Sequence, residues 1–129
     1  MINKVILTGR LTATPVLKKT SSDVPVTAFS VAVQRQYKGP DGNYPTDFLN
    51  CVAWRNTAEF ICKYFQKGEL IALVGALQTR NYEDKQGSKR IAFEVICDEA
   101  HFVESKRKNA APDVQAEEFQ EVSDDELPF

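Results

Sequence analysis

The sequence lacks the motifs that mark common enzymes and cofactor sites. It contains no phosphate loop of the GxxxxGK[ST] or GxGxxG type, and neither HExxH nor GxSxG. Its one histidine, His101, has no partner in a recognisable catalytic pattern. The two pairs of neighbouring acids, Glu83 with Asp84 and Asp98 with Glu99, are expected in turns, where acidic side chains are normally solvated. We therefore predict a binding protein that uses no cofactor, and not an enzyme.

Cysteine is scarce. Cys51, Cys62 and Cys97 are an odd number in isolated positions, and none stands in a CxxC motif. With a single histidine to join them, they do not make a typical zinc site. Buried free thiols are expected, with no disulfide and no bound metal.

Long apolar runs are absent as well. None approaches the roughly 20 residues that span a bilayer, and the start, MINKVILTGR, reaches a charged residue too early for a secretory signal. A chain of 129 residues with 43% hydrophobic content has room for one modest core. The expectation is a single-domain cytosolic protein that makes no contact with a membrane.

Charge is divided unevenly along the chain. Residues 1–104 hold 13 Lys/Arg against 11 Asp/Glu, whereas residues 105–129 hold 3 against 7, and no base follows Asn109. The body is slightly basic and the tail is acidic, which suggests two different partners.

Five segments are predicted to be β-strands, because apolar and β-branched residues alternate in them and turn-forming residues separate them. They are residues 3–12, 26–36, 46–55, 69–77 with a continuation into 78–84, and 90–97. Gly9 and Gly75 interrupt two of these strands and predict the bends or bulges that a small closed sheet requires. Residues 18–25 and 37–45 are predicted to be exposed connections.

One helix is predicted between the third and fourth strands. Asn56 and Glu59 form a capping-box-like pair at its start, and Gly68 is expected to end it. The apolar stripe assigned to the core consists of Phe60, Ile61, Tyr64 and Phe65. Five strands with a helix in this place predict an all-β, five-stranded OB-fold Greek-key barrel.

The third strand, TDFLNCVAWR, combines a small apolar face with a face that carries two large rings. Side chains alternate along a strand, so Phe48 and Trp54 share one face and Cys51 lies on the other. At about 3.3 Å per residue the rings lie roughly 20 Å apart, a distance that several unstacked nucleotides can bridge. The strand alone leaves open whether these rings belong to the core or to a stacking surface.

Rings and basic residues also occur together elsewhere in the body. The groups are Arg35 with Tyr37 and Lys38, Phe48, Trp54 with Arg55, and Arg80 with Tyr82 and Lys85. Bases stack on such rings for about 1 to 3 kcal/mol each, and Lys or Arg contact phosphates. The pattern favours a single-stranded nucleic acid as the partner.

Three stretches resemble a known family: NKVILTGRLT, then TDFLNCVAWRNTAEFICKYFQKGELIALVGALQTRNYED, and the terminal DDELPF. They are similar to bacterial and phage single-stranded DNA-binding proteins of the homotetrameric OB-fold type. The resemblance implies sequence-independent binding of single-stranded DNA in replication, recombination and repair, in the bacterial cytosol near the nucleoid. It implies four stacking rings, which are Tyr37, Phe48, Trp54 and Tyr82. The phosphate contacts expected with them come from Lys4, Arg10, Arg35, Lys38, Arg55, Arg80 and Lys85.

The resemblance and the change in composition divide the chain into three parts. Residues 1–104 are the OB-fold domain, 105–123 a short disordered linker, and 124–129 an acidic peptide that binds proteins of DNA replication, recombination and repair. The peptide, called the tip below, consists of Asp124, Asp125, Glu126, Leu127, Pro128 and Phe129. A terminal ring suits an apolar pocket, while Arg or Lys of the partner pairs with the carboxylates.

Two other functions remain open at this point. An RNA-binding or translation-associated OB-fold protein would use the same rings and phosphate contacts. A structural adaptor in a replication or recombination complex would act mainly through its tail. Titration with DNA and with RNA distinguishes a DNA-binding protein from an RNA-binding one. The effect of Trp54→Ala on function distinguishes either of these from the adaptor.

Overall fold

The computed structural model describes residues 1–103, so the predicted linker and tip lie outside the described residues. In chain order the elements are β1 (Val5–Leu11), β2 (Lys18–Lys19), β3 (Pro25–Gln34), β4 (Thr46–Trp54), α1 (Arg55–Tyr64), β5 (Leu70–Glu83) and β6 (Lys89–Phe102). The five long strands lie where the sequence predicts them, but β6 runs on to Phe102 instead of ending at Cys97. The two-residue β2 is an addition, because part of the connection predicted before β3 pairs with the edge of that strand.

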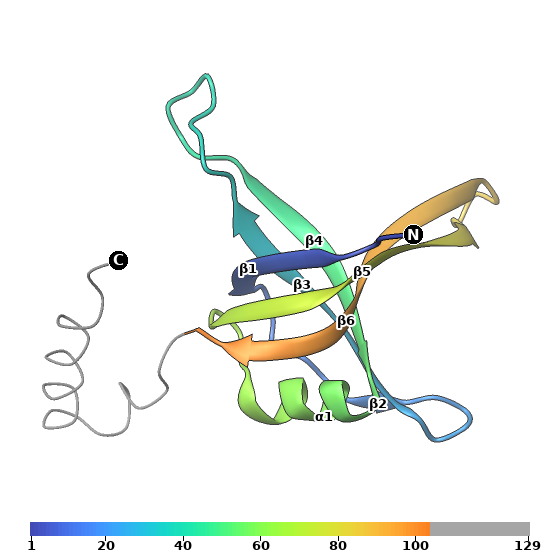
Figure 1. Cartoon of the computed structure of the whole chain (residues 1–129). Coiled ribbons are helices and arrows are strands. Elements are labelled where there is room, and N and C mark those ends of the chain that lie inside the picture. Colours follow the sequence, from blue (N-terminus) through green and yellow to red (C-terminus); the bar gives the residue numbers. More distant parts are fainter. Residues whose placement is uncertain (104–129) are drawn as a thin grey trace, which may run out of the picture.

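The strands form one sheet in the order β1-β5-β6-β4-β3-β2, and a further pairing of β1 with β3 closes it into a barrel. Neighbouring strands are antiparallel except β4 and β6, which run parallel. The helix α1 lies between β4 and β5 in the chain and covers one end of the barrel (Figure 1). The predicted OB-fold Greek-key barrel is therefore confirmed.

The core lies between α1 and the inward faces of the strands. Ala58, Ile61 and Phe65 are at most 2% exposed and pack with buried residues of the sheet such as Val31 and Leu73. Burying a side chain of the size of Leu or Phe contributes about 1.5 to 3 kcal/mol, so this contact holds the helix on the barrel.

Two glycines allow the sheet to close. Gly9 lies where β1 turns from β5 to pair with β3, and a Cβ there would stand 2.7 Å from the carbonyl oxygen of Ala32. Gly75 lies at a register shift between β5 and β6, with the backbone of Ile96 against it. Both positions agree with the predicted bends or bulges.

The predicted caps of α1 are wrong. The helix begins at Arg55, and the preceding Trp54 makes no side-chain capping hydrogen bond, so Asn56 already lies in the first turn. Strand β4 runs directly into the helix through Arg55, whose φ of 55° makes the turn and leaves no loop residue to serve as a cap. The helix ends at Tyr64, and Gly68, at φ 88°, instead turns the chain towards β5.

Other sequence expectations concern thiols, metals and membranes. Cys51 and Cys97 are buried free thiols as predicted, whereas Cys62 is only partly buried. A hydrogen bond with Cys51 and, after it, burial raise the pKa of the Cys97 thiol far above its usual value. Within residues 1–103 there is no group of three potential metal ligands, and no helix has the length and apolarity that crossing a membrane requires.

Candidate nucleic-acid interface

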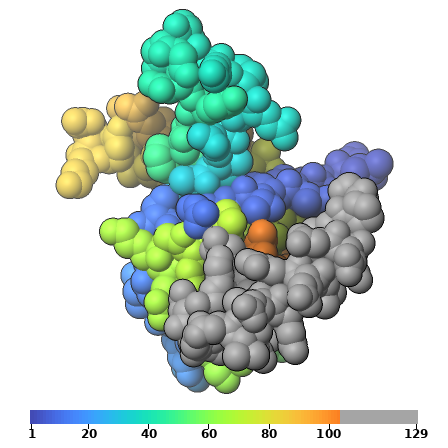
Figure 2. All heavy atoms as spheres, turned by 90° about the vertical axis from the view of Figure 1, so that its left-hand side faces the viewer, coloured from blue at the N-terminus to red at the C-terminus, as the bar shows by residue number. Residues whose placement is uncertain are grey.

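Two hairpin arms extend from the barrel and diverge from each other (Figure 1). One is formed by β3 and β4 with the loop 35–45, and the other by β5 and β6 with the turn 84–88. In Figure 2 the outer end of the first arm stands at the top and the outer end of the second projects to the left. The predicted stacking rings are distributed over these arms and the sheet between them.

The outer face of β4 carries Phe48 and Trp54, which are 67% and 42% exposed. Directly opposite residues of an antiparallel pair share a face. Phe48 is opposite Ala32 and Trp54 is opposite Val26, so small or medium side chains of β3 flank both rings. Cys51, on the other face of β4, is only 1% exposed. The two rings therefore belong to the surface and not to the core, which decides the question that the strand alone left open.

The same face continues across β6 to the second arm. Val52 pairs with Ile96, and Ile96 pairs with Ala76 of β5. Every second residue of β5 beyond Ala76 shares its face, which places Arg80 and Tyr82 there. Tyr82 is 42% exposed. We call this face, with Phe48, Trp54 and Tyr82, the ring surface.

Tyr37, unlike the other three predicted stacking rings, is held by a hydrogen bond from Arg35. The Arg35 guanidinium donates two hydrogen bonds of 2.9 Å to the Asp47 carboxylate and a third, of 3.1 Å, to the Tyr37 hydroxyl. Asp47 points to the opposite side of β4 from its neighbour Phe48, because side chains alternate along the strand. The structure therefore brings Phe48, Trp54 and Tyr82 onto one face and anchors Tyr37 to the other side of the first arm.

The ion pair with Asp47 also changes the electrostatics of this arm. Hydrogen bonds from Arg35 lower the pKa of the Asp47 carboxyl, and hydrogen bonds to Asp47 and Tyr37 raise the pKa of Arg35. Arg35 thus remains charged, but its charge is largely balanced by a neighbouring carboxylate. Its clearest structural role is to orient the Tyr37 ring, which is 61% exposed.

On the second arm Arg80, like Arg35 on the first, lies between a carboxylate and a tyrosine. Its Nη2 lies 3.0 Å from Oε2 of Glu94, and its guanidinium carbon lies 5.6 Å from the centre of the Tyr82 ring. At the turn of this arm Arg90 pairs with Asp84 at 3.0 Å and lowers the pKa of that carboxyl. Basic side chains therefore steady the Tyr82 ring and the turn of the arm.

The remaining predicted phosphate contacts are exposed and scattered around the rings. Arg10 lies across β3 from Phe48, since both residues pair with Ala32, and it donates to the Gly68 carbonyl at 2.9 Å. Arg55 directly follows Trp54. The positions outside strands and helix are Lys4 before β1, Lys38 in the first arm's loop and Lys85 in the second arm's turn.

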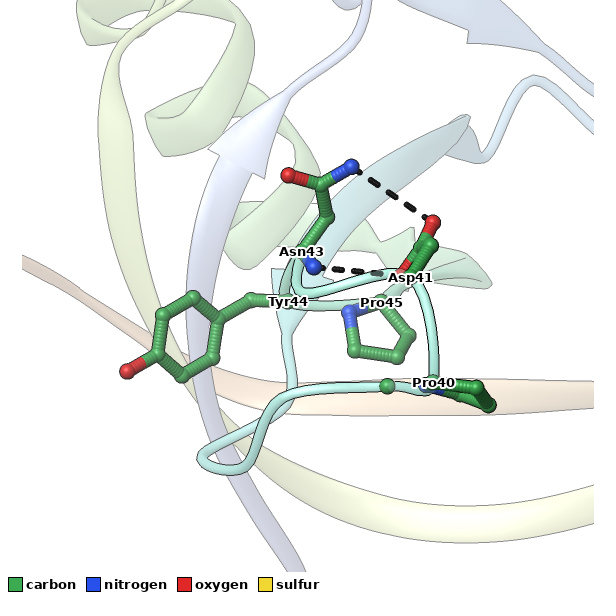
Figure 3. A pocket seen from close by; sticks show the side chains of 6 residues that line it. Pro40, Asp41, Asn43, Tyr44 and Pro45 are labelled. Atoms are coloured by element: carbon green, nitrogen blue, oxygen red, sulfur yellow. Dashed lines mark hydrogen bonds between the residues drawn. The ribbon is translucent and has the colours of Figure 1, made fainter.

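The sequence prediction missed Tyr44, in the loop of the first arm. Tyr44 is 44% exposed, and the Nζ atom of Lys38 lies 5.9 Å from the centre of its ring. It borders an open hollow of about 410 Å³ beside Pro40 and Pro45, which Figure 3 shows from close by. The signal in the sequence was the second tyrosine of the loop, close to Lys38 and between turn residues.

Two more exposed apolar residues were not selected. Ile91 and Phe93 are 58% and 60% exposed and lie on the opposite face of the second arm from Tyr82. Their spacing of two residues on β6 was the available signal. His101 is exposed, with its Nε2 atom 3.0 Å from Oε1 of Glu99.

Comparison with known proteins gives consistent matches. Residues 2–103 match the Single-strand binding protein family. The chain is 41% identical to Single-stranded DNA-binding protein 1 of Lactococcus lactis subsp. lactis, over 150 aligned residues that cover all of both chains. It is 43% identical to the single-stranded DNA-binding protein of Caldanaerobacter subterraneus subsp. tengcongensis, with 91% of this chain and 80% of the relative covered. It is 45% identical to Single-stranded DNA-binding protein 1 of Streptococcus pyogenes serotype M18, with 86% and 85% covered.

Proposed function

Since this chain belongs to the single-strand binding protein family, we propose that it binds single-stranded DNA without sequence preference and protects it during replication, recombination and repair. The family consists of DNA-binding proteins and not of enzymes, as the sequence predicts for this chain. The bacterial relatives support a place in the bacterial cytosol, at the nucleoid.

The observation that carries the proposal is the ring surface. Phe48, Trp54 and Tyr82 stand exposed on one face of a continuous sheet, at positions where the family resemblance expects stacking. Every base has a π-face, so stacking tolerates any sequence. A DNA strand that also reaches Tyr37 must pass around the first arm, because that ring is anchored to the other side of β4.

Electrostatics adds less to this binding than the number of basic residues suggests. Arg35 and Arg80 are each paired with a carboxylate within 3.0 Å. Exposed ion pairs of this kind reduce the net positive charge that the strand meets. Stacking therefore supplies most of the affinity, and Lys4, Lys38, Arg55 and Lys85 supply contacts to the phosphates.

The fluorescence of Trp54, which is the only tryptophan, tests the proposal directly. Titration with oligo-dT should quench it strongly, and the quenching should persist in moderate salt, because a base covers the indole ring. Duplex DNA should have little effect. Equal or stronger quenching by matched RNA would favour the RNA-binding alternative. The absence of quenching by any strand would favour the adaptor.

We also propose that the protein forms a homotetramer. β1 pairs with β3 only through Arg10 and Leu11, so within the described chain the edge formed by residues 5–8 has no strand beside it. Such an edge can pair with another chain, and Ile6 beside it is 75% exposed. Sedimentation equilibrium should give the mass of a tetramer of 14.5 kDa chains, and a monomer mass would contradict the proposal.

The tip, residues 124–129, is proposed to recruit enzymes of DNA replication, recombination and repair. Leu127 and Phe129 supply apolar anchors among acids, and Pro128 lowers the ordering cost of binding. A chain that lacks residues 123–129 should still bind oligo-dT and should no longer retain these enzymes on an affinity resin. Retention equal to that of the full chain would contradict this role.

A further inference from the structure

A row of three residues crosses the outer face of the sheet at Trp54. Trp54 of β4 is directly opposite Val26 of β3, and Val26 is directly opposite Lys18 of the short strand β2. Directly opposite residues of antiparallel strands share a face, so Lys18 lies on the same face as the Trp54 ring. Neighbouring strands are about 4.8 Å apart, which places the Cα atoms of Lys18 and Trp54 roughly 10 Å from each other. We call these three residues the Trp54 row.

The two ends of the Trp54 row suit the two parts of a nucleotide. Trp54 and Lys18 are both exposed, and Val26 between them is half-buried. Lysine carries its charge on a flexible four-carbon stem, which can extend away from its own strand. A nucleotide whose base stacks on Trp54 therefore has its phosphate within reach of the Lys18 ammonium group.

The charge of Lys18 is available for such a contact. Within residues 1–103 Lys18 forms no ion pair, whereas the Nζ atom of its neighbour Lys19 lies 3.7 Å from Oδ1 of Asp23. Lys19 is opposite Pro25, and the alternation of side chains along a strand directs it away from the face that carries Lys18. Of these two adjacent lysines, only Lys18 combines an uncompensated charge with a place on the ring surface.

The same order of side chains recurs at Phe48. Phe48 is opposite Ala32, and Ala32 is opposite Arg10 of β1. Each of the two rings on β4 thus has a basic side chain beyond a small or medium residue of β3. The guanidinium of Arg10 already donates a hydrogen bond of 2.9 Å to the Gly68 carbonyl. The Trp54 row is therefore the clearer of the two candidates for a phosphate contact.

Lys63 of α1 lies too far from Trp54 to take the same role. It stands nine residues after Trp54, which is about 13 Å along the helix axis, and its Nζ atom is 5.2 Å from the centre of the Tyr64 ring. Tyr64 is 38% exposed, so the prediction that it belongs to the core is wrong, because the sheet covers only one side of α1.

We propose that Lys18 binds the phosphate of the nucleotide whose base stacks on Trp54. The inference rests on the proposed binding of single-stranded DNA and adds a contact to it. Residues 18–25 were predicted only as an exposed connection, and it is the pairing of β2 with β3 that brings Lys18 into line with Trp54. Such a contact fixes the course of the bound strand, since its phosphates must pass over β3 and β2 while its bases face β4.

The salt dependence of binding tests the inference. Lys18→Gln removes the charge, and Lys19→Gln is the matched control at the adjacent exposed lysine. The probe is a labelled oligo-dT of about 8 to 12 nucleotides, short enough for one barrel, whose anisotropy is measured at several salt concentrations. One phosphate contact on a single strand contributes about 0.7 to the slope of log K against log of the salt concentration. Lys18→Gln should therefore reduce the slope by about 0.7, so that its loss of affinity shrinks about fivefold over a tenfold rise in salt. Lys19→Gln should leave the slope as it is.

Double variants locate the contact. Lys18→Gln should lose most of its effect when Trp54 is also replaced by alanine, because no stacked base would then hold a phosphate beside it. Combined with Phe48→Ala it should keep its full effect, since Phe48 lies roughly 20 Å from Trp54 along β4.

Three results would overturn the inference. They are an unchanged slope for Lys18→Gln, an equal reduction for Lys19→Gln, and a full effect of Lys18→Gln in the Trp54→Ala background. Strong quenching of Trp54 by oligo-dT in the original chain would in each case leave the proposed function intact. Absence of that quenching would overturn both.

Discussion

Replacing Trp54 with alanine should weaken binding of oligo-dT by about 5- to 150-fold, because one base–ring stack contributes about 1 to 3 kcal/mol and 1.4 kcal/mol corresponds to a factor of ten. The fold should survive, since the ring is 42% exposed and stands outside the core. Because the variant lacks its fluorophore, the affinity is measured by the anisotropy of labelled oligo-dT.

Phe48→Ala should cause a loss of similar size. Phe48 and Trp54 are six residues apart on β4, roughly 20 Å, so their effects should be close to independent. The double variant is therefore expected to lose about the product of the two single factors. A clearly smaller loss would mean that one strand does not contact both rings at once.

Phe93→Ala is the matched control for both variants. Phe93 is 60% exposed, nearly as much as Phe48, but it lies on the opposite face of the second arm from Tyr82. Its removal should change the affinity by less than about twofold, the scale of an ordinary surface substitution. Equal losses for Phe93→Ala and Trp54→Ala would refute the ring surface, and full affinity of Trp54→Ala would favour the adaptor.

Gly75→Ala should lower the free energy of unfolding by about 3 kcal/mol, near the upper end for overpacking substitutions. The new Cβ would meet the carbonyl oxygen of Ile96 at a distance that real Cβ atoms do not adopt. Backbone cannot move aside as a flexible side chain can, so β5 and β6 must separate at the bulge. Urea unfolding followed by the fluorescence of Trp54 measures the change.

Gly39→Ala is the control for this substitution. A Cβ at Gly39 would meet its nearest atom, Oδ1 of Asp41, at 3.4 Å, which is ordinary contact. Its effect on stability should stay within about 0.5 kcal/mol. Equal stability of the two variants would show that the close approach at Gly75 does not limit the barrel.

Local pattern in the sequence determined much of this protein. The alternation in TDFLNCVAWR placed Phe48 and Trp54 opposite Cys51, and the structure agrees. The succession of strands along the chain and the place of the helix between the third and fourth of them also followed from periodicity and turn residues. These features depend on neighbours along the chain, which is why they can be deduced without a structure.

Only the tertiary structure decided what lies beside what. It exposed Phe48 and Trp54, joined Arg35 to Asp47 and Tyr37, and brought Phe102 to the end of α1. It also replaced the predicted cap at Asn56 with a direct passage from strand to helix. Each of these outcomes depends on contacts between residues that are distant in the sequence, or on the path that the chain takes around the barrel. A local sequence pattern carries no information on either.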